Sequence, residues 1–154
     1  MTLYLAALLL GVVAGLRAMT PVAAVCWAAS LGMLKLAGTP LAILGSTVAV
    51  WIATLAAGFE LVSDKLPKTP SRKVPLQFGA RILMGGLAGG AVGTSGGALA
   101  IGAVLGVVGA VAGTYGGAAA RGRLAARFGR DLPAALTEDL TAVVGAALIV
   151  CFLL

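Results

Sequence analysis

The chain has 154 residues, of which 60% are hydrophobic and only 10% are charged, and its formal net charge is +6. Soluble domains usually carry about 25% charged residues, so the composition excludes an ordinary soluble protein. The apolar stretches also lack the alternation of apolar and polar residues found in the strands of membrane β-barrels. We therefore expect an all-α integral membrane protein, a compact bundle of five or six transmembrane segments that forms a single domain over residues 1–154.

The excess positive charge falls into two clusters that separate apolar segments. One cluster is Lys65, Lys68, Arg72 and Lys73, and the other is Arg121, Arg123, Arg127 and Arg130. The positive-inside rule places such loops on the cytoplasmic side of a membrane, against anionic lipid headgroups. We expect membrane lipid as a partner and no binding of nucleic acid.

The composition also argues against an enzyme. The absence of histidine removes the usual general base and the commonest metal ligand. The two cysteines, Cys26 and Cys151, each lie in an apolar run, as small buried residues do. Since no nucleophile stands near a base in the sequence, we expect no catalytic activity, no metal and no cofactor.

The first apolar stretch must break near its middle. As one straight helix, residues 3–36 would be about 50 Å long, whereas the hydrocarbon core of a bilayer is about 30 Å thick. Pro21 lacks a backbone donor and disfavours helix at Thr20, so we place the break at residues 17–21. Two separate spans here make six segments with both termini outside, whereas one broken span makes five segments with the N-terminus inside.

Four further apolar segments follow in the chain. They are residues 41–59, 78–91, 98–120 and 142–154, and a turn at 38–40 precedes the first of them. A polar loop from 60 to 75, a turn at 93–97 and the second basic loop separate them in that order. The basic loops, residues 63–77 and 121–136, are expected on the inside. Thr137 has the position of a helix N-cap, with Glu138 and Asp139 in the first turn, where the helix dipole favours acids.

Short motifs and glycines recur along the chain. Gly15-Leu16-Arg17 returns as Gly79-Ala80-Arg81, and Leu66-Pro67 returns as Leu132-Pro133. The chain thus either holds two related helical hairpins or repeats short apolar sequence by chance. Glycines stand at four-residue steps at positions 85, 89, 93 and 97, at 102 and 106, and at 109, 113 and 117. These steps favour close helix packing in lipid, with a flexible gate as the functional alternative.

Arg17 and Arg81 are the candidate substrate-binding residues. A permanent cation at membrane depth costs roughly 2.5–3.5 kcal/mol on insertion scales, so each arginine needs an acidic partner, a water-filled cavity or a bound anion. Thr20 and the backbone amides freed near Pro21 add donors beside Arg17, and together they suit a carboxylate or phosphate. The alternative is that Arg17 pairs with acids or backbone carbonyls and holds the bundle together.

Four acids are the candidate charge partners of these arginines. Glu60 and Asp64 are spaced i, i+4 and share one face if the helix continues through them. They either pair with the arginines inside the bundle or end an interfacial helix with local ion pairs. Glu138 and Asp139 either join the same pairing or serve only as the first turn of a capped helix.

The same residues carry a family resemblance over nearly the whole chain. In order, they are Gly15-Leu16-Arg17 with Thr20-Pro21, Glu60 with Asp64-Lys65 and Pro67, Gly79 with Arg81, the glycine-rich hairpin, and Glu138-Asp139. The chain resembles a family of small bacterial inner-membrane proteins described only as a domain of unknown function. This resemblance implies a multi-pass protein of the bacterial inner (cytoplasmic) membrane, and it implies no particular activity.

The function that we expect is that of a small transporter or channel-like protein for an anionic or proton-coupled solute. Arg17 and Arg81 would hold the anion, and Glu60 or Asp64 would balance or relay charge. The alternative is a non-transporting scaffold or an accessory subunit of a membrane complex, in which glycine faces and basic loops make the contacts. Since so small a chain leaves little room for a pathway, we expect a homo-oligomer, with a dimer favoured.

Overall fold

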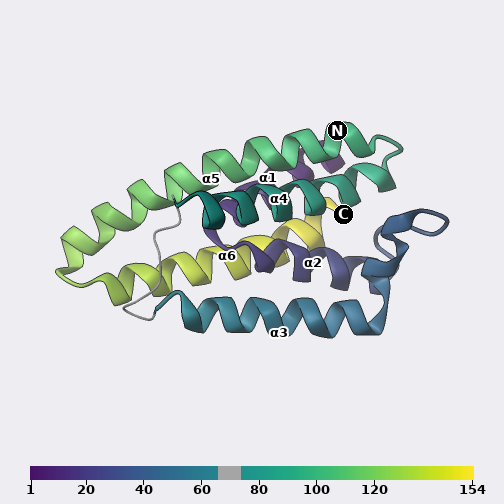
Figure 1. The fold of residues 1–154 in the computed structure, drawn as a ribbon. Coiled ribbons are helices and arrows are strands. Elements are labelled where there is room, and N and C mark those ends of the chain that lie inside the picture. Colours follow the sequence, from purple (N-terminus) through teal and green to yellow (C-terminus); the bar gives the residue numbers. More distant parts are fainter. Residues whose placement is uncertain (66–73) are drawn as a thin grey trace.

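The computed structural model describes residues 1–65 and 74–154, which form a bundle of helices (Figure 1). The elements in chain order are α1 (Thr2–Leu16), α2 (Met19–Ser30), the 3₁₀ helix η1 (Pro40–Gly45), α3 (Thr47–Ser63), α4 (Pro75–Ser95), α5 (Leu99–Phe128) and α6 (Asp131–Leu153). No strand occurs in these two ranges, which confirms the all-α fold class for the part of the chain that is described. The most extensive packing joins α5 to α1 and to α4.

The surface of the bundle is apolar, and its core is made of small residues. On α3, the side chains of Val48, Trp51, Ile52, Leu55 and Phe59 are all more than half exposed. Soluble monomers rarely expose large contiguous apolar patches, so such a surface is typical of a membrane-associated or interaction-forming protein. Two helices, α5 and α6, are long and apolar enough to cross a membrane, judged by length and composition.

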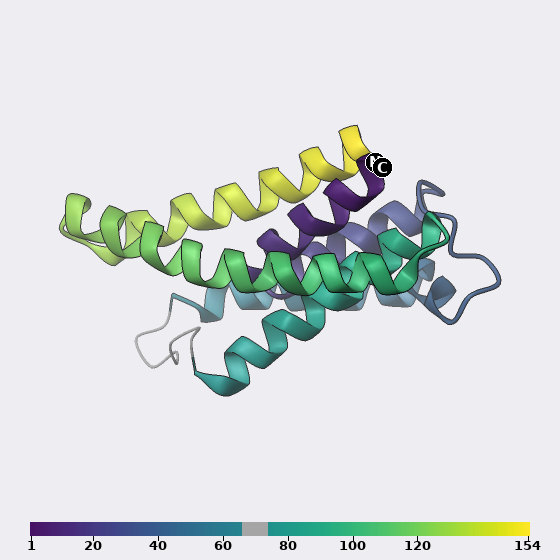
Figure 2. The ribbon, with the colours of Figure 1, turned by 90° about the horizontal axis from the view of Figure 1, so that it is seen from above.

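The first apolar stretch breaks at Arg17, within the predicted region. Helix α1 ends at Leu16, Arg17 has an extended backbone, and α2 begins at Met19. Pro21 follows in the first turn of α2, where a missing backbone donor costs no helical hydrogen bond. The chain reverses direction at the break, and both termini lie at the same end of the molecule (Figures 1 and 2).

Glycines bring α5 against two other helices at backbone contact distance. A Cβ atom added at Gly106 would lie 2.1 Å from the carbonyl oxygen of Gly85 on α4, and one added at Gly11 on α1 would lie 2.2 Å from that of Gly106. A Cβ at Gly109 would lie 2.1 Å from the carbonyl oxygen of Leu8. The prediction of close helix packing is therefore confirmed at Gly106 and Gly109, and any side chain at these three glycines would force the helices apart.

Three details of the predicted elements are wrong. Helix α6 begins at Asp131, so Thr137 lies inside the helix and donates its hydroxyl to the carbonyl of Ala134 instead of capping an N-terminus. The segment predicted as one span from residue 41 starts as η1, and α3 begins only at Thr47. Helix α4 continues through the predicted turn to Ser95, and Gly97, with φ of 74°, makes the turn.

Some predicted features lie outside the described residues. They are Leu66-Pro67, which was expected to echo Leu132-Pro133, and the basic residues Lys68, Arg72 and Lys73.

Candidate functional site

Arg17, at the break between α1 and α2, is completely buried and surrounded by carboxylates. Its Nε donates to Asp139 Oδ1 at 2.7 Å, and its Nη1 donates to Asp64 Oδ2 at 2.6 Å. Its Nη2 lies 2.5 Å from the same oxygen of Asp139 and 3.9 Å from Glu138 Oε2. The side chain has 0% exposure, and its Nη2 makes ion-pair contacts but has no hydrogen-bond partner among the described residues. Arg17 therefore links the helix break to α3 and to α6.

Arg81 approaches the same place from the second turn of α4. Its Nη1 donates to the carbonyl oxygens of Gly15 and Leu16 at 2.9 and 2.6 Å, which are acceptors that the end of α1 leaves without helical partners. Its Nη2 lies 3.7 Å from Asp64 Oδ2 and 4.0 Å from Glu60 Oε1. The two arginines thus converge on Asp64, an arrangement that a guanidinium's several donors permit.

Glu60 caps the N-terminus of α2 from a distant part of the chain. Its two carboxylate oxygens accept hydrogen bonds from the backbone amides of Ala18 and Met19, at 2.7 and 2.8 Å. These are donors that a helix start leaves free, and the positive end of the helix dipole favours the carboxylate. The amides that we considered as donors to a bound anion are therefore occupied by a carboxylate of the protein itself.

Replacing Glu60 with alanine is expected to lower the free energy of unfolding by about 1–3 kcal/mol, because the amides of Ala18 and Met19 lose their acceptors. Thermal unfolding in detergent, followed by far-ultraviolet circular dichroism, measures the change. Glu60→Gln keeps one acceptor oxygen, and its loss should be smaller. An unfolding transition of Glu60→Ala equal to that of the unmodified protein would contradict this capping role.

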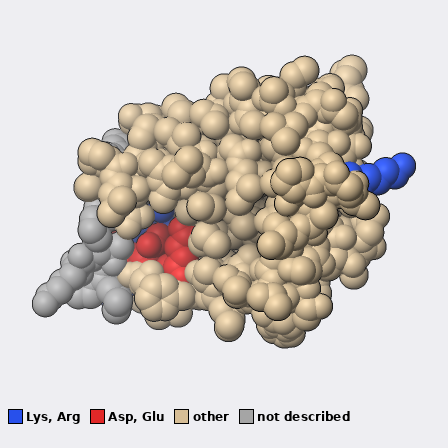
Figure 3. All heavy atoms as spheres, turned by 45° about the vertical axis from the view of Figure 1, so that its right-hand side comes forward, with Lys and Arg blue, Asp and Glu red and all other residues tan. Residues whose placement is uncertain are grey.

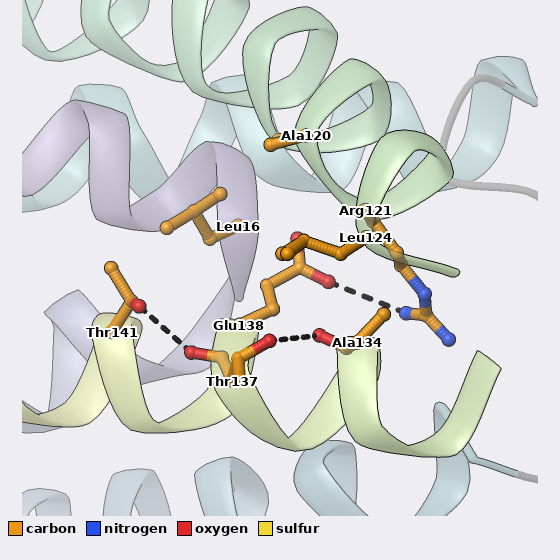
Figure 4. A pocket seen from close by; sticks show the side chains of 9 residues that line it. Leu16, Ala120, Arg121, Leu124, Ala134, Thr137, Glu138 and Thr141 are labelled. Carbon is orange, nitrogen blue, oxygen red and sulfur yellow. Dashed lines mark hydrogen bonds and ion pairs between the residues drawn. The ribbon is translucent and has the colours of Figure 1, made fainter. Parts of the chain in front are cut away.

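The α6 side of the site extends toward the surface. Lys65 Nζ forms a short ion pair with Asp139 Oδ2, and Arg121 Nη1 lies 3.3 Å from Glu138 Oε2. Glu138 and Arg121 line a cavity of about 110 Å³ between α5 and α6, together with Leu16 (Figure 4). Outside it, Asp131, whose side chain is 64% exposed, forms a two-bond pair with Arg121.

We call these eight interacting residues the carboxylate–guanidinium network. They are Arg17, Glu60, Asp64, Lys65, Arg81, Arg121, Glu138 and Asp139. Four are cations and four are carboxylates, and Asp131 adds a fifth carboxylate at the surface through its pair with Arg121. Its acids reach the surface in part, and Figure 3 shows acidic side chains gathered in one patch of a surface that is otherwise largely uncharged.

The structure separates the remaining two predicted site residues from this network. Pro21 is buried in the first turn of α2. Thr20 is 7% exposed, and its hydroxyl oxygen has no hydrogen-bond partner among the described residues. It lines a different hollow, a groove between α2, α3 and α6, and does not join Arg17.

Two members of the network, Lys65 and Arg121, were not predicted as site residues. Each was assigned to a basic loop, where topology alone accounts for positive charge. The available signal for Lys65 was its place directly after Asp64, at the end of an apolar helix. For Arg121, the signal was its place directly after the apolar segment that had been expected to end at residue 120. In the structure, helix α5 continues through it.

A family model matches the chain over residues 4–152. The family is described as "Domain of unknown function (DUF4126)". No curated protein and no solved structure matches the chain.

Proposed function

Because the chain belongs to this family, whose description assigns no activity, we propose a function from the site itself: a small, non-enzymatic transporter or channel-like protein that moves protons or a proton-coupled solute across the bacterial inner membrane. The observation that carries the proposal is Arg17, fully buried at a helix break and held between Asp64 and Asp139. Ionisable groups inside helical membrane proteins commonly mark ion pathways.

The membrane placement in this proposal is a multi-pass one with six segments. Helix α5, at 30 residues, is about 45 Å long, and α4, at 21 residues, is about 31 Å long, the thickness of a hydrocarbon core. The shorter α1 and α2 enter from the end where both termini lie and turn back at Arg17. The basic residues Arg123 and Arg127, near the C-terminal end of α5, and Arg130, between α5 and α6, lie at the other end and favour its cytoplasmic location.

The charge balance favours a proton over an anion as the species handled. An anion at Arg17 would have to displace Asp64 or Asp139, because each nitrogen of the guanidinium already contacts a carboxylate oxygen. The network offers no surplus positive charge among the described residues to compensate that displacement. A proton needs only to add to one carboxylate and weaken one ion pair.

The geometry suggests how protons would pass the buried arginine. Arg17 cannot release its own proton in a protein, so a relay must run between the carboxylates that flank it. Asp64 and Asp139 contact opposite parts of the same guanidinium, and their side chains are 14% and 12% exposed. Each acid therefore connects the surface to the same buried cation.

Proton flux into vesicles tests this function. In proteoliposomes that contain a pH-sensitive dye, with a potassium diffusion potential as the driving force, the unmodified protein should acidify the lumen. We expect Asp64→Asn and Asp139→Asn to reduce the rate at least about tenfold, since an amide cannot take up a proton in this range. Lys35→Gln is the control, because this exposed cation lies outside the network, and its rate should be unchanged. Equal rates with and without the unmodified protein would contradict the proposal.

A second candidate is a non-transporting scaffold or accessory subunit. The engagement of all three Arg17 nitrogens favours it, because such a residue joins α1, α3 and α6 without requiring a solute. If this is the function, Asp64→Asn and Asp139→Asn would lower the stability of the protein, and vesicles with the unmodified protein or either variant would show no proton flux. In either function we propose assembly as a homodimer, which light scattering of the purified protein–detergent complex measures.

A further inference from the structure

The groove between α2, α3 and α6 is separate from the network and unused by the proposed function. Its walls carry Thr20, Ala24 and Trp27 from α2, Thr54, Ala57 and Leu61 from α3, and Val143, Ala146, Ala147, Val150 and Cys151 from α6. The hollow has a volume of about 360 Å³, within the range of about 300–1,000 Å³ typical of small-molecule sites. Almost all of its lining is apolar, and small side chains make the depression.

The position of the groove along the helices relates it to one leaflet of a bilayer. Its walls begin at Leu61, one turn before Asp64, and at Val143, one turn after Asp139. From Val143 to Cys151 the groove is about 12 Å long at 1.5 Å per residue, compared with about 15 Å for half of a hydrocarbon core. The groove therefore starts next to the carboxylates and extends toward the middle of the membrane.

One polar group in the groove lacks a partner. Two threonines line it, and the hydroxyl of Thr54 both accepts from Trp27 Nε1 at 3.1 Å and donates to the carbonyl of Val50. The hydroxyl of Thr20, by contrast, has no hydrogen-bond partner among the described residues, although the residue is 93% buried, or 7% exposed. A buried hydroxyl without a partner is costly, so an acceptor placed in the groove within its reach would stabilise it.

We propose that the groove binds one acyl chain of an inner-leaflet phospholipid, with the Thr20 hydroxyl donating to the ester carbonyl at the head of that chain. This inference rests on the membrane placement proposed above. The volume of about 360 Å³ is at the small end of the range for ligand sites, which favours a single chain over a whole helix with a diameter of about 10 Å. A hydrocarbon chain matches the apolar walls, and its ester lies at the end of the groove that is next to the network.

Photocrosslinking tests the site. The full chain is reconstituted into vesicles of phosphatidylethanolamine and phosphatidylglycerol with a trace of phospholipid carrying a diazirine in its acyl chain. We expect crosslinks concentrated in peptides of α2, α3 and α6. Ala147→Phe should fill the groove and reduce them about tenfold, whereas Ala112→Phe, at an exposed alanine of α5 outside the groove, should leave them unchanged.

The hydroxyl is tested with an ether-linked analogue, which lacks the ester carbonyl. Both lipids are added as competitors of the crosslinking probe. In the unmodified protein, the ester lipid should compete at a concentration about fivefold lower than the ether lipid, as expected for one hydrogen bond. Thr20→Val should abolish that preference. Crosslinks spread evenly over all apolar helix faces, or unaffected by Ala147→Phe, would overturn the site and leave the proton-flux prediction standing. A protein that carbonate extraction removes from the vesicles would overturn both proposals.

Discussion

Replacing Arg17 with alanine is expected to lower the free energy of unfolding by about 3–5 kcal/mol, the typical cost of removing one partner from a buried ion pair. The change removes the guanidinium donors from Asp64 Oδ2 and Asp139 Oδ1, whose side chains are only 14% and 12% exposed. Reversible unfolding in mixed micelles, monitored by circular dichroism, measures the loss.

Two further variants show whether the loss comes from the network. Asp139→Asn in the Arg17→Ala background removes one of the stranded charges and should recover part of the stability, so the two effects are not additive. Lys35→Ala removes an exposed cation outside the network and should change stability by less than about 0.5 kcal/mol. If Arg17→Ala and Lys35→Ala unfold alike, Arg17 does not hold the bundle together.

Replacing Gly106 with alanine is expected to destabilise the protein by about 1–3 kcal/mol or more, as overpacking does. The added Cβ would lie 2.1 Å from the carbonyl oxygen of Gly85 and 3.1 Å from the Cα of Gly89. Both are backbone atoms, so they can give way only if α4 and α5 move apart. Unfolding in the same micelles measures the cost.

Gly116→Ala is the matched control in the same helix. A Cβ at Gly116 meets no atom within 4 Å, so this change should be neutral or should stabilise the helix by up to about 1 kcal/mol. Because both variants replace glycine with alanine within α5, their difference isolates the helix contact from intrinsic helix propensity. Similar stabilities for the two variants would show that the close contact at Gly106 contributes little.

The fold class and the helix break followed from local features of the sequence. The length of the first apolar stretch and Pro21 together required a break near Arg17, and four-residue glycine steps predicted close helix contacts. The predicted start of α6 was wrong because Thr137, followed by two acids, has the sequence pattern of a capped N-terminus. The helix in fact begins earlier, at Asp131, with Pro133 in its first turn. Local capping signals cannot distinguish a true start from a polar turn within a longer helix.

The site was predictable in its members more than in its geometry. Arg17 and Asp139 are 122 positions apart, and only tertiary packing decides that they meet and that Thr20 does not join them. The binding of Glu60 to the amides of α2 was equally hidden, because a helix N-cap usually comes from an adjacent residue. What the sequence indicated was a cost: an arginine among apolar residues requires some compensating group.

The separation of Arg17 from its partners along the chain also bears on biosynthesis. Asp64 and Asp139 are translated after Arg17, from which they are separated by 47 and 122 positions. While the ribosome is still making α5, the guanidinium has at most one of its two acidic neighbours on α3 and α6, and full immersion in lipid is correspondingly unfavourable. In the membrane placement proposed above, the N-terminal hairpin therefore reaches its final depth only after α6 has been made and Asp139 has met Arg17.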